Sequence, residues 1–137
     1  MAIVEELIRS EENGTISFGN YKMEKKGKVE DFKHAGDLFK VKTCKEITRL
    51  EKNGLFLYES VPGTSVFSFA ETQTGVEFAV EGETDAQITV GLAENAEYKV
   101  TVGSAAVGTM KTGLSGKLSI SVEFGTTGEI PVKISRI

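Results

Sequence analysis

The sequence predicts an all-β protein, in which a short helix and a β-meander over residues 1–61 precede an immunoglobulin-like β-sandwich over residues 62–137. Apolar and polar residues alternate with a period of two in many short segments, most clearly over residues 118–124. The chain of 137 residues has 15 glycines and two prolines, which suits short strands joined by tight turns. Beyond residue 62 these strand-like segments recur at the spacing typical of sandwiches.

The first segment predicts a helix of about two turns. Four apolar residues share one face at helical spacing, and charged residues occupy the other: Ile3, Val4, Leu7 and Ile8 against Glu5, Glu6 and Arg9. So short a helix is unstable alone in water, so we expect it to dock on its own sheet or on a neighbouring subunit. The Asn13-Gly14 pair ends the segment and turns the chain.

The meander is expected to contain five strands, near residues 15–22, 29–32, 38–43, 47–50 and 55–59. The second and third pair about the turn at residues 34–37, and the last two form a hairpin about Asn53-Gly54, a strong hairpin signal. Four lysines around Gly27 indicate a solvated hairpin tip or, less favoured, an anion or RNA contact.

The strand at residues 55–58 is apolar on both faces, which is unusual for a strand with one face in water. A strand buried on both sides explains this pattern most simply. If one face instead meets another molecule, this strand is the best candidate for an interface or a ligand platform. We therefore single out Phe56 and Tyr58, together with Tyr21, as candidate interface or ligand-binding residues.

The sandwich is expected to contain seven strands, near residues 65–70, 76–80, 87–92, 97–102, 107–112, 117–124 and 129–134. The glycine at position 116 suits a tight turn, so the strands near 107–112 and 117–124 are predicted to be antiparallel neighbours. The chain lacks the paired cysteines and the tryptophan of antibody domains, so the likeness concerns architecture alone.

Composition limits the classes of function. The formal net charge is −4, all of it carried by residues 62–137, which argues against nucleic-acid partners and anionic membranes. A single cysteine, Cys44, excludes an internal disulfide framework and fits a reducing compartment. The first residues have no secretory leader and no apolar stretch is long enough to span a bilayer, so we expect a cytoplasmic protein.

No catalytic or metal-binding constellation stands out, and we expect no cofactor. The sole histidine, His34, follows no nucleophile motif; Asp37 could orient it, but a surface role is favoured. There is no phosphate-binding glycine loop and no G-x-S-x-G elbow. The three carboxylates within residues 81–85 lack calcium-loop spacing and indicate an exposed turn.

Two stretches carry a family resemblance: G-D-L-F-K-V-K-T-C-K-E-I-T-R-L-E-K-N-G-L-F-L-Y-E-S-V-P-G-T at residues 36–64 and K-T-G-L-S-G-K-L-S-I-S-V-E at residues 111–123. The chain resembles a family of small proteins from Gram-positive gut anaerobes that often carry the label "endosialidase". The resemblance implies no catalytic residues. Sialidases resemble much longer propellers with an arginine cluster for the sialate carboxylate, whereas this chain has three arginines, Arg9, Arg49 and Arg136.

These observations favour a non-enzymatic interaction or assembly protein that forms homo-oligomers. The short helix and the strand at 55–58 each have an apolar face that must be buried against another surface. The alternative is a carbohydrate-binding module in which exposed aromatic rings such as Tyr21 or Tyr58 stack on sugars, although tryptophan is missing. A glycosidase is the least favoured reading, because nothing nominates a carboxylate pair.

Overall fold

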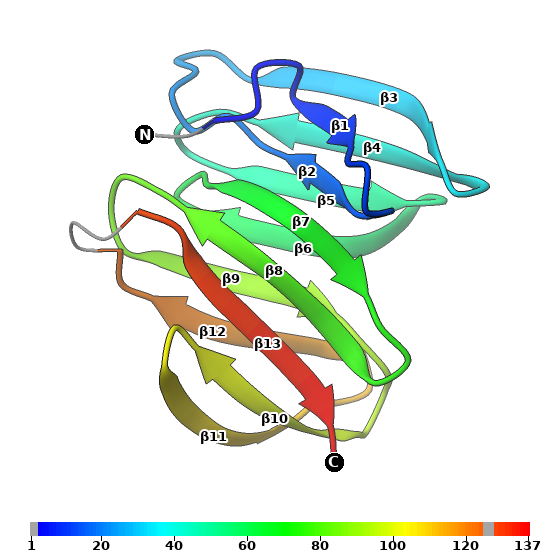
Figure 1. Cartoon of the computed structure of the whole chain (residues 1–137), viewed down its shortest axis with the longest axis vertical. Helices are drawn as coiled ribbons and strands as arrows, with labels where there is room; N and C mark the ends of the chain where they lie inside the picture. The colour runs from blue at the N-terminus through cyan, green and yellow to red at the C-terminus, as the bar shows by residue number, and fades with distance from the viewer. Residues whose placement is uncertain (1–2, 125–127) are drawn as a thin grey trace.

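The computed structural model describes residues 3–124 and 128–137, and it is an all-β fold of two antiparallel sheets (Figure 1). No helix occurs among these described residues, and so none that could cross a membrane. The seven-stranded sheet has the order β1-β2-β7-β8-β13-β10-β11, and the six-stranded sheet has the order β12-β9-β6-β5-β4-β3.

The strand bounds agree closely with most of the predicted segments. In chain order they are β1 Ile8–Ser10, β2 Ile16–Phe18, β3 Gly27–His34, β4 Asp37–Thr43, β5 Thr48–Lys52, β6 Leu55–Val61, β7 Ser65–Glu71, β8 Gly75–Glu81, β9 Ala86–Gly91, β10 Glu97–Val102, β11 Ala105–Lys111, β12 Lys117–Val122 and β13 Ile130–Arg136. The segment between the strands predicted near 117–124 and 129–134 lies, apart from Gly128, outside the described residues.

The core lies between the two sheets and is built from the inward residues of both. In β12 every second residue is buried, as the alternation predicts. Tyr58 lies at the centre of an aromatic cluster, with ring centroids 5.3 Å from Phe18 and 5.6 Å from Phe78, both edge to face. Such geometry is favourable beyond the area it buries.

Buried hydroxyl groups join the sheets beside this cluster. The Tyr58 hydroxyl lies 2.8 Å from Thr64 Oγ1, and Ser60 Oγ lies 2.7 Å from the same atom. Thr48 Oγ1 donates to the Thr64 carbonyl at 2.7 Å, so β5, β6 and the residue that precedes β7 share one network. Each buried polar group in it has a partner, as burial requires.

Two predicted hairpins are confirmed. Strands β3 and β4 pair up to His34 opposite Asp37, and the turn residues Ala35 and Gly36 have φ of 51° and 85°. Strands β5 and β6 pair up to Lys52 opposite Leu55 across Asn53-Gly54, with φ of 51° and 79°. Two successive positive φ values are what a two-residue turn of type I′ needs.

The predicted N-terminal helix is not found, since residues 5–7 form a turn and Ile8–Ser10 is strand β1. Val4 and Leu7 bond to the backbone of Gly19: Val4 N donates to Gly19 O at 3.2 Å, and Gly19 N donates to Leu7 O at 2.9 Å. Val4 and Ile8 are buried in this extended arrangement. Because two helical turns have little stability of their own, pairing with the sheet prevails.

The predicted hairpin between strands near 107–112 and 117–124 is wrong. Strand β11 pairs with β10 in the seven-stranded sheet, and β12 pairs with β9 in the six-stranded sheet. The chain between them crosses from one sheet to the other: Leu92 N donates to Gly116 O at 2.7 Å, and Thr112 Oγ1 donates to Ala93 O at 2.5 Å. The glycine turn therefore packs on the loop after β9 instead of closing a hairpin.

The immunoglobulin-like topology predicted for residues 62–137 is not confirmed. Constant-type domains of that fold divide their seven strands as four and three, whereas β7 to β13 divide as five and two. Both sheets also contain strands from each side of residue 62, because β2 pairs with β7 and β6 pairs with β9.

Candidate functional site

The outer face of the seven-stranded sheet carries a row of apolar side chains, which we call the apolar strip: Phe67, Ala79 and Pro131. Register places them side by side, since Phe67 is opposite Ala79 and Ala79 is opposite Pro131. Their chain neighbours Val66, Val80 and Val132 are buried on the inner face, so the strip faces outward. Phe67 is half-buried and lies outside the core cluster.

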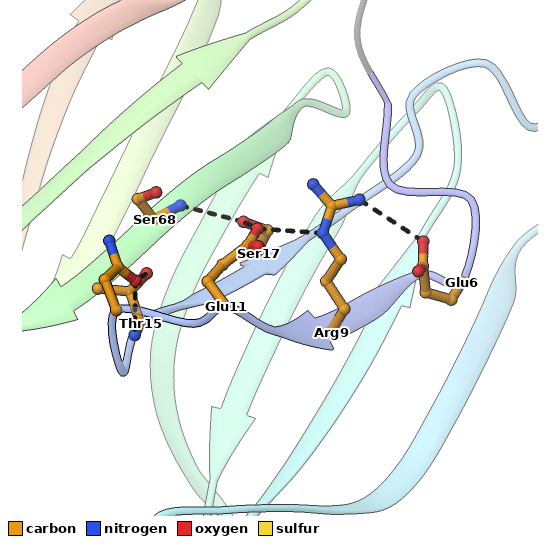
Figure 2. Close-up of polar contacts among 7 residues, drawn as sticks. Glu6, Arg9, Glu11, Thr15, Ser17 and Ser68 are labelled. Carbon is orange, nitrogen blue, oxygen red and sulfur yellow. Dashed lines mark hydrogen bonds and ion pairs between the residues drawn. The ribbon is translucent and has the colours of Figure 1, made fainter.

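A polar cluster adjoins the strip at β1 and β2. Figure 2 shows Arg9, Glu11, Ser17 and Ser68 joined by a chain of contacts. Arg9 Nε donates to Glu11 Oε2 at 3.0 Å, and the Ser17 hydroxyl donates to the same carboxylate oxygen. These two donors, with Ser17 the stronger cause, lower the pKa of Glu11 below its ordinary value despite partial desolvation.

A bulge in β7 connects the cluster to the strip. The pairing of β7 with β8 shifts between Phe67 and Ala70, and Ser68 has a φ of 54°. Its backbone N–H donates to Ser17 Oγ at 3.1 Å, so the buried Ser17 hydroxyl is satisfied as both donor and acceptor. The bulge thus fixes Phe67 beside Arg9 and Glu11.

Two shallow grooves run along this face and meet at Ser68. The first has a volume of about 510 Å³ and includes Arg9, Glu11, Glu12, Phe67, Ser68 and Glu129 among its lining residues. The second has a volume of about 440 Å³ and includes Ser68, Glu77, Ala79, Thr101, Pro131 and Lys133. Together they form an open surface with an aromatic ring and charged groups along its length.

The sequence-predicted candidate Phe56 lies elsewhere, on the outer face of the six-stranded sheet. Its ring is half-buried between Arg49 and Lys117, whose charged groups lie 5.3 Å and 4.5 Å from the ring centroid. The doubly apolar pattern at 55–58 has a local cause: the register between β5 and β6 shifts here, so Leu57 and Tyr58 are both buried. Their own chain covers Leu57 and Tyr58, whereas Leu55 at the start of the strand is 72% exposed.

The exposure expected for Tyr21 and Tyr58 is wrong. Their side chains are 1% and 0% exposed, so neither ring reaches the surface of this structure. A tyrosine satisfies either a core or a surface position, because it has an apolar ring and a polar tip, and the sequence alone does not distinguish the two. Cys44 is buried, as a small core residue.

His34 lies at one end of the sandwich, beside a pocket of about 360 Å³ whose inner wall includes Phe39 and Phe69. Its ring nitrogens lie 2.8 Å from Ser10 Oγ and 2.9 Å from the Gly14 carbonyl oxygen. Both nitrogens therefore have partners that join β3 to the β1–β2 hairpin, which agrees with a surface structural role.

The charged residues at this end pair with one another. Lys52 Nζ lies 2.9 Å from Glu71 and 3.6 Å from Asp37, and Asn53 donates to Asp37 at 2.9 Å. The Asn53 hydrogen bond, followed by Lys52, lowers the pKa of Asp37. No set of three or more His, Cys, Asp or Glu side chains placed to hold a metal ion occurs within residues 3–124 and 128–137.

The free edge of the seven-stranded sheet is a second notable surface. In β11 all side chains but Met110 are exposed, and Val107 is 55% exposed at a bulge opposite β10. Ala105 and Gly108 are opposite Val102 and Val100 and so share their inward face, yet both are exposed. No strand of the six-stranded sheet covers them.

Neither the apolar strip nor the β11 edge was among the predicted site residues. The Phe67-Ser68-Phe69 alternation indicates a strand but not that Phe67 faces outward, and sheet order decides which strand becomes an edge. The family resemblance stays a prediction resting on the sequence motifs quoted above. Comparisons with protein-family models, with curated proteins and with solved structures find no match for this chain.

Proposed function

We propose that this is a non-enzymatic interaction protein that assembles with itself through the free edge of β11. The exposure of six of the seven β11 residues is the observation that carries the proposal. The two sequence features that predict self-association give it little support in the structure. No helix occurs among the described residues, and Leu57 and Tyr58 are buried by their own chain, although Leu55 is 72% exposed. The strand edge takes their place.

Two of the other three edge strands, β3 and β1, are better protected against pairing. The third, β12, also carries one charge, Lys117, but its inward side chains are buried, whereas β11 is exposed on both faces. Strand β3 carries four charged residues and a bulge at Asp31, whose φ is 56°. Strand β1 has three residues and ion pairs of Arg9 at its side. Such charges, bulges and short strands are the usual means of preventing edge-to-edge association. In β11 the bulge at Val107 is present, but the one charge is Lys111 at its end.

The ends of the two sheets explain why β11 is free. The Ser10–His34 hydrogen bond brings β1 against β3, so the sheets are aligned at that end. The seven-stranded sheet has one strand more, and β11 therefore extends past β12 at the other end. In a two-fold dimer, antiparallel pairing of β11 with its copy would continue the ladder and bury Val107.

Light scattering coupled to gel filtration tests this proposal at micromolar concentration and physiological salt. We expect a particle of twice 14.8 kDa. Val107→Lys and Thr109→Lys should each give a monomer, because a two-fold axis brings like charges together across the new ladder. Gln73→Lys adds the same charge in an exposed turn and should leave the dimer intact.

A monomeric wild type would overturn the proposal. A dimer that persists in both β11 variants would also overturn it, because the interface would then lie elsewhere. The three arginines lie in different places, on the outer faces of the two sheets and at the end of β13, and their separation supports the non-enzymatic part of the proposal. A cytoplasmic location remains part of the same proposal.

A further inference from the structure

We propose that the outer face of the seven-stranded sheet binds a neutral oligosaccharide along the apolar strip of Phe67, Ala79 and Pro131. This inference is independent of self-assembly, because the surface lies on a sheet face and not on the β11 edge. Tyr21 and Tyr58, the candidates for sugar stacking predicted from the sequence, are buried, whereas the ring of Phe67 lines a groove.

The strip has the shape and polarity of a surface for pyranose rings. Phe67, Ala79 and Pro131 follow one another across three neighbouring strands, so they form a low apolar row without a deep pocket. One face of a pyranose ring carries mainly C–H groups and can lie flat on such a row. The two grooves meet at Ser68, one lined by Phe67 and the other by Ala79 and Pro131, and together they allow several sugar units to bind in line.

The polar groups beside the strip suit hydroxyl groups, which both donate and accept. Arg9 supplies N–H donors, and Glu11 and Glu129 supply acceptors, all lining the groove that contains Phe67. Arg9 and Glu11 are held in place by their ion pair at 3.0 Å and by the bond from Ser17. Groups fixed in advance lose less side-chain entropy on binding.

The charge of the grooves selects against acidic sugars. The first groove has one arginine, Arg9, against three glutamates, Glu11, Glu12 and Glu129, a balance of −2. The second is neutral, since Glu77 faces Lys133 at 3.9 Å. A sialylated or uronic-acid chain would bring its carboxylates into this negative field, so a glycan made of neutral hexoses or pentoses is the ligand class that fits.

The test is a titration of the full-length protein with cellohexaose, maltohexaose and xylohexaose, using 3′-sialyllactose as the charged probe. We expect at least one neutral chain to bind, as heat in calorimetry and as amide shifts at Phe67, Ala79 and their neighbours. Phe67→Ala should weaken that binding at least about tenfold, because the ring contact is lost. Arg9→Met, which keeps the β1 strand intact, should also weaken it.

Phe56→Ala is the matched control, because Phe56 is the other half-buried phenylalanine outside the core and lies on the opposite sheet. It should bind like the wild type. The proposal is overturned if no neutral chain binds at millimolar concentration, if folded Phe67→Ala and Arg9→Met bind normally, or if sialyllactose binds as tightly. Amide shifts confined to another surface, or binding of a peptide alone, would overturn it as well.

Discussion

Tyr21 shows how one buried side chain can carry an unsatisfied polar group. It is 1% exposed, and its hydroxyl has no hydrogen-bond partner among the described residues. Tyr58 is equally buried, but its hydroxyl reaches Thr64. Burial first, and then the charges of Glu81 and Glu83, raise the pKa of Tyr21 from its ordinary value of 10.0 to about 12.

Replacing Tyr21 by phenylalanine should therefore change the stability at high pH more than at neutral pH. Below pH 10 the phenol is protonated in both the folded and the unfolded chain. Between about pH 10 and 12 the unfolded chain releases this proton and the folded chain keeps it, so wild-type stability falls by up to about 1.4 kcal/mol per pH unit from this group. Tyr21→Phe should remove that part of the slope.

Urea unfolding at a series of pH values measures the free energy of unfolding at neutral pH and its slope with pH above pH 10. At neutral pH we expect Tyr21→Phe to stay within about 1 kcal/mol of the wild type, because no hydrogen bond is lost. Tyr98→Phe is the contrasting control: its hydroxyl accepts the Ala93 N–H at 3.1 Å, and its loss should cost about 1–3 kcal/mol. If the free energy of unfolding falls equally with pH above pH 10 in the wild type and in Tyr21→Phe, then Tyr21 does not cause this loss of stability.

At the scale of single elements, the sequence predicts local pairings well and distant ones poorly. The turns at Ala35-Gly36 and Asn53-Gly54 fix their hairpins through backbone conformation, which is a property of those residues. The glycine turn ending at Gly116 has the same appearance, yet it leads to the other sheet because its backbone bonds to Leu92. That bond joins residues 24 positions apart, and nothing local encodes it.

Bulges account for the errors at the candidate sites. One extra residue at Leu57 makes strand β6 bury two successive side chains, which the sequence presents as a two-faced strand. Another at Ser68 places Phe67 against the Arg9–Glu11 pair. A bulge changes which face the following residues occupy, and period-two patterns alone do not locate it.

Close approach of neighbouring strands leaves no room for a side chain at Gly75. A Cβ at Gly75 would lie 1.9 Å from the backbone carbonyl oxygen of Ile134, in the ladder between β8 and β13. Backbone atoms cannot move aside cheaply, so Gly75→Ala should destabilise the protein by about 3 kcal/mol or more. Gly113→Ala, where no atom lies within 4 Å, should change stability little. The midpoint temperature of thermal unfolding, measured for both variants, tests this prediction. A Gly75→Ala protein as stable as the wild type would show that β8 and β13 are farther apart.

For the whole molecule, composition and periodicity were sufficient for the all-β class and for two facing sheets, but not for the order of strands. That order depends on ladders between distant segments, such as β2 with β7 and β6 with β9. The short N-terminal segment shows the same dependence. Its apolar residues do recur at helical spacing, but burying Val4 and Ile8 against the sheet stabilises the chain more than a helix of two turns would.

The ladders that cross residue 62 predict that the chain unfolds as one unit. Separating residues 1–61 from 62–137 would leave β7 without β2 and β9 without β6, which exposes inward residues such as Phe69 and Ile88. Native-state hydrogen exchange should then give the most protected amides of β6 and β12 the same opening free energy. A markedly lower value for β6 would mean that the first part opens alone, and residues 62–137 would then be expected to fold when expressed without it.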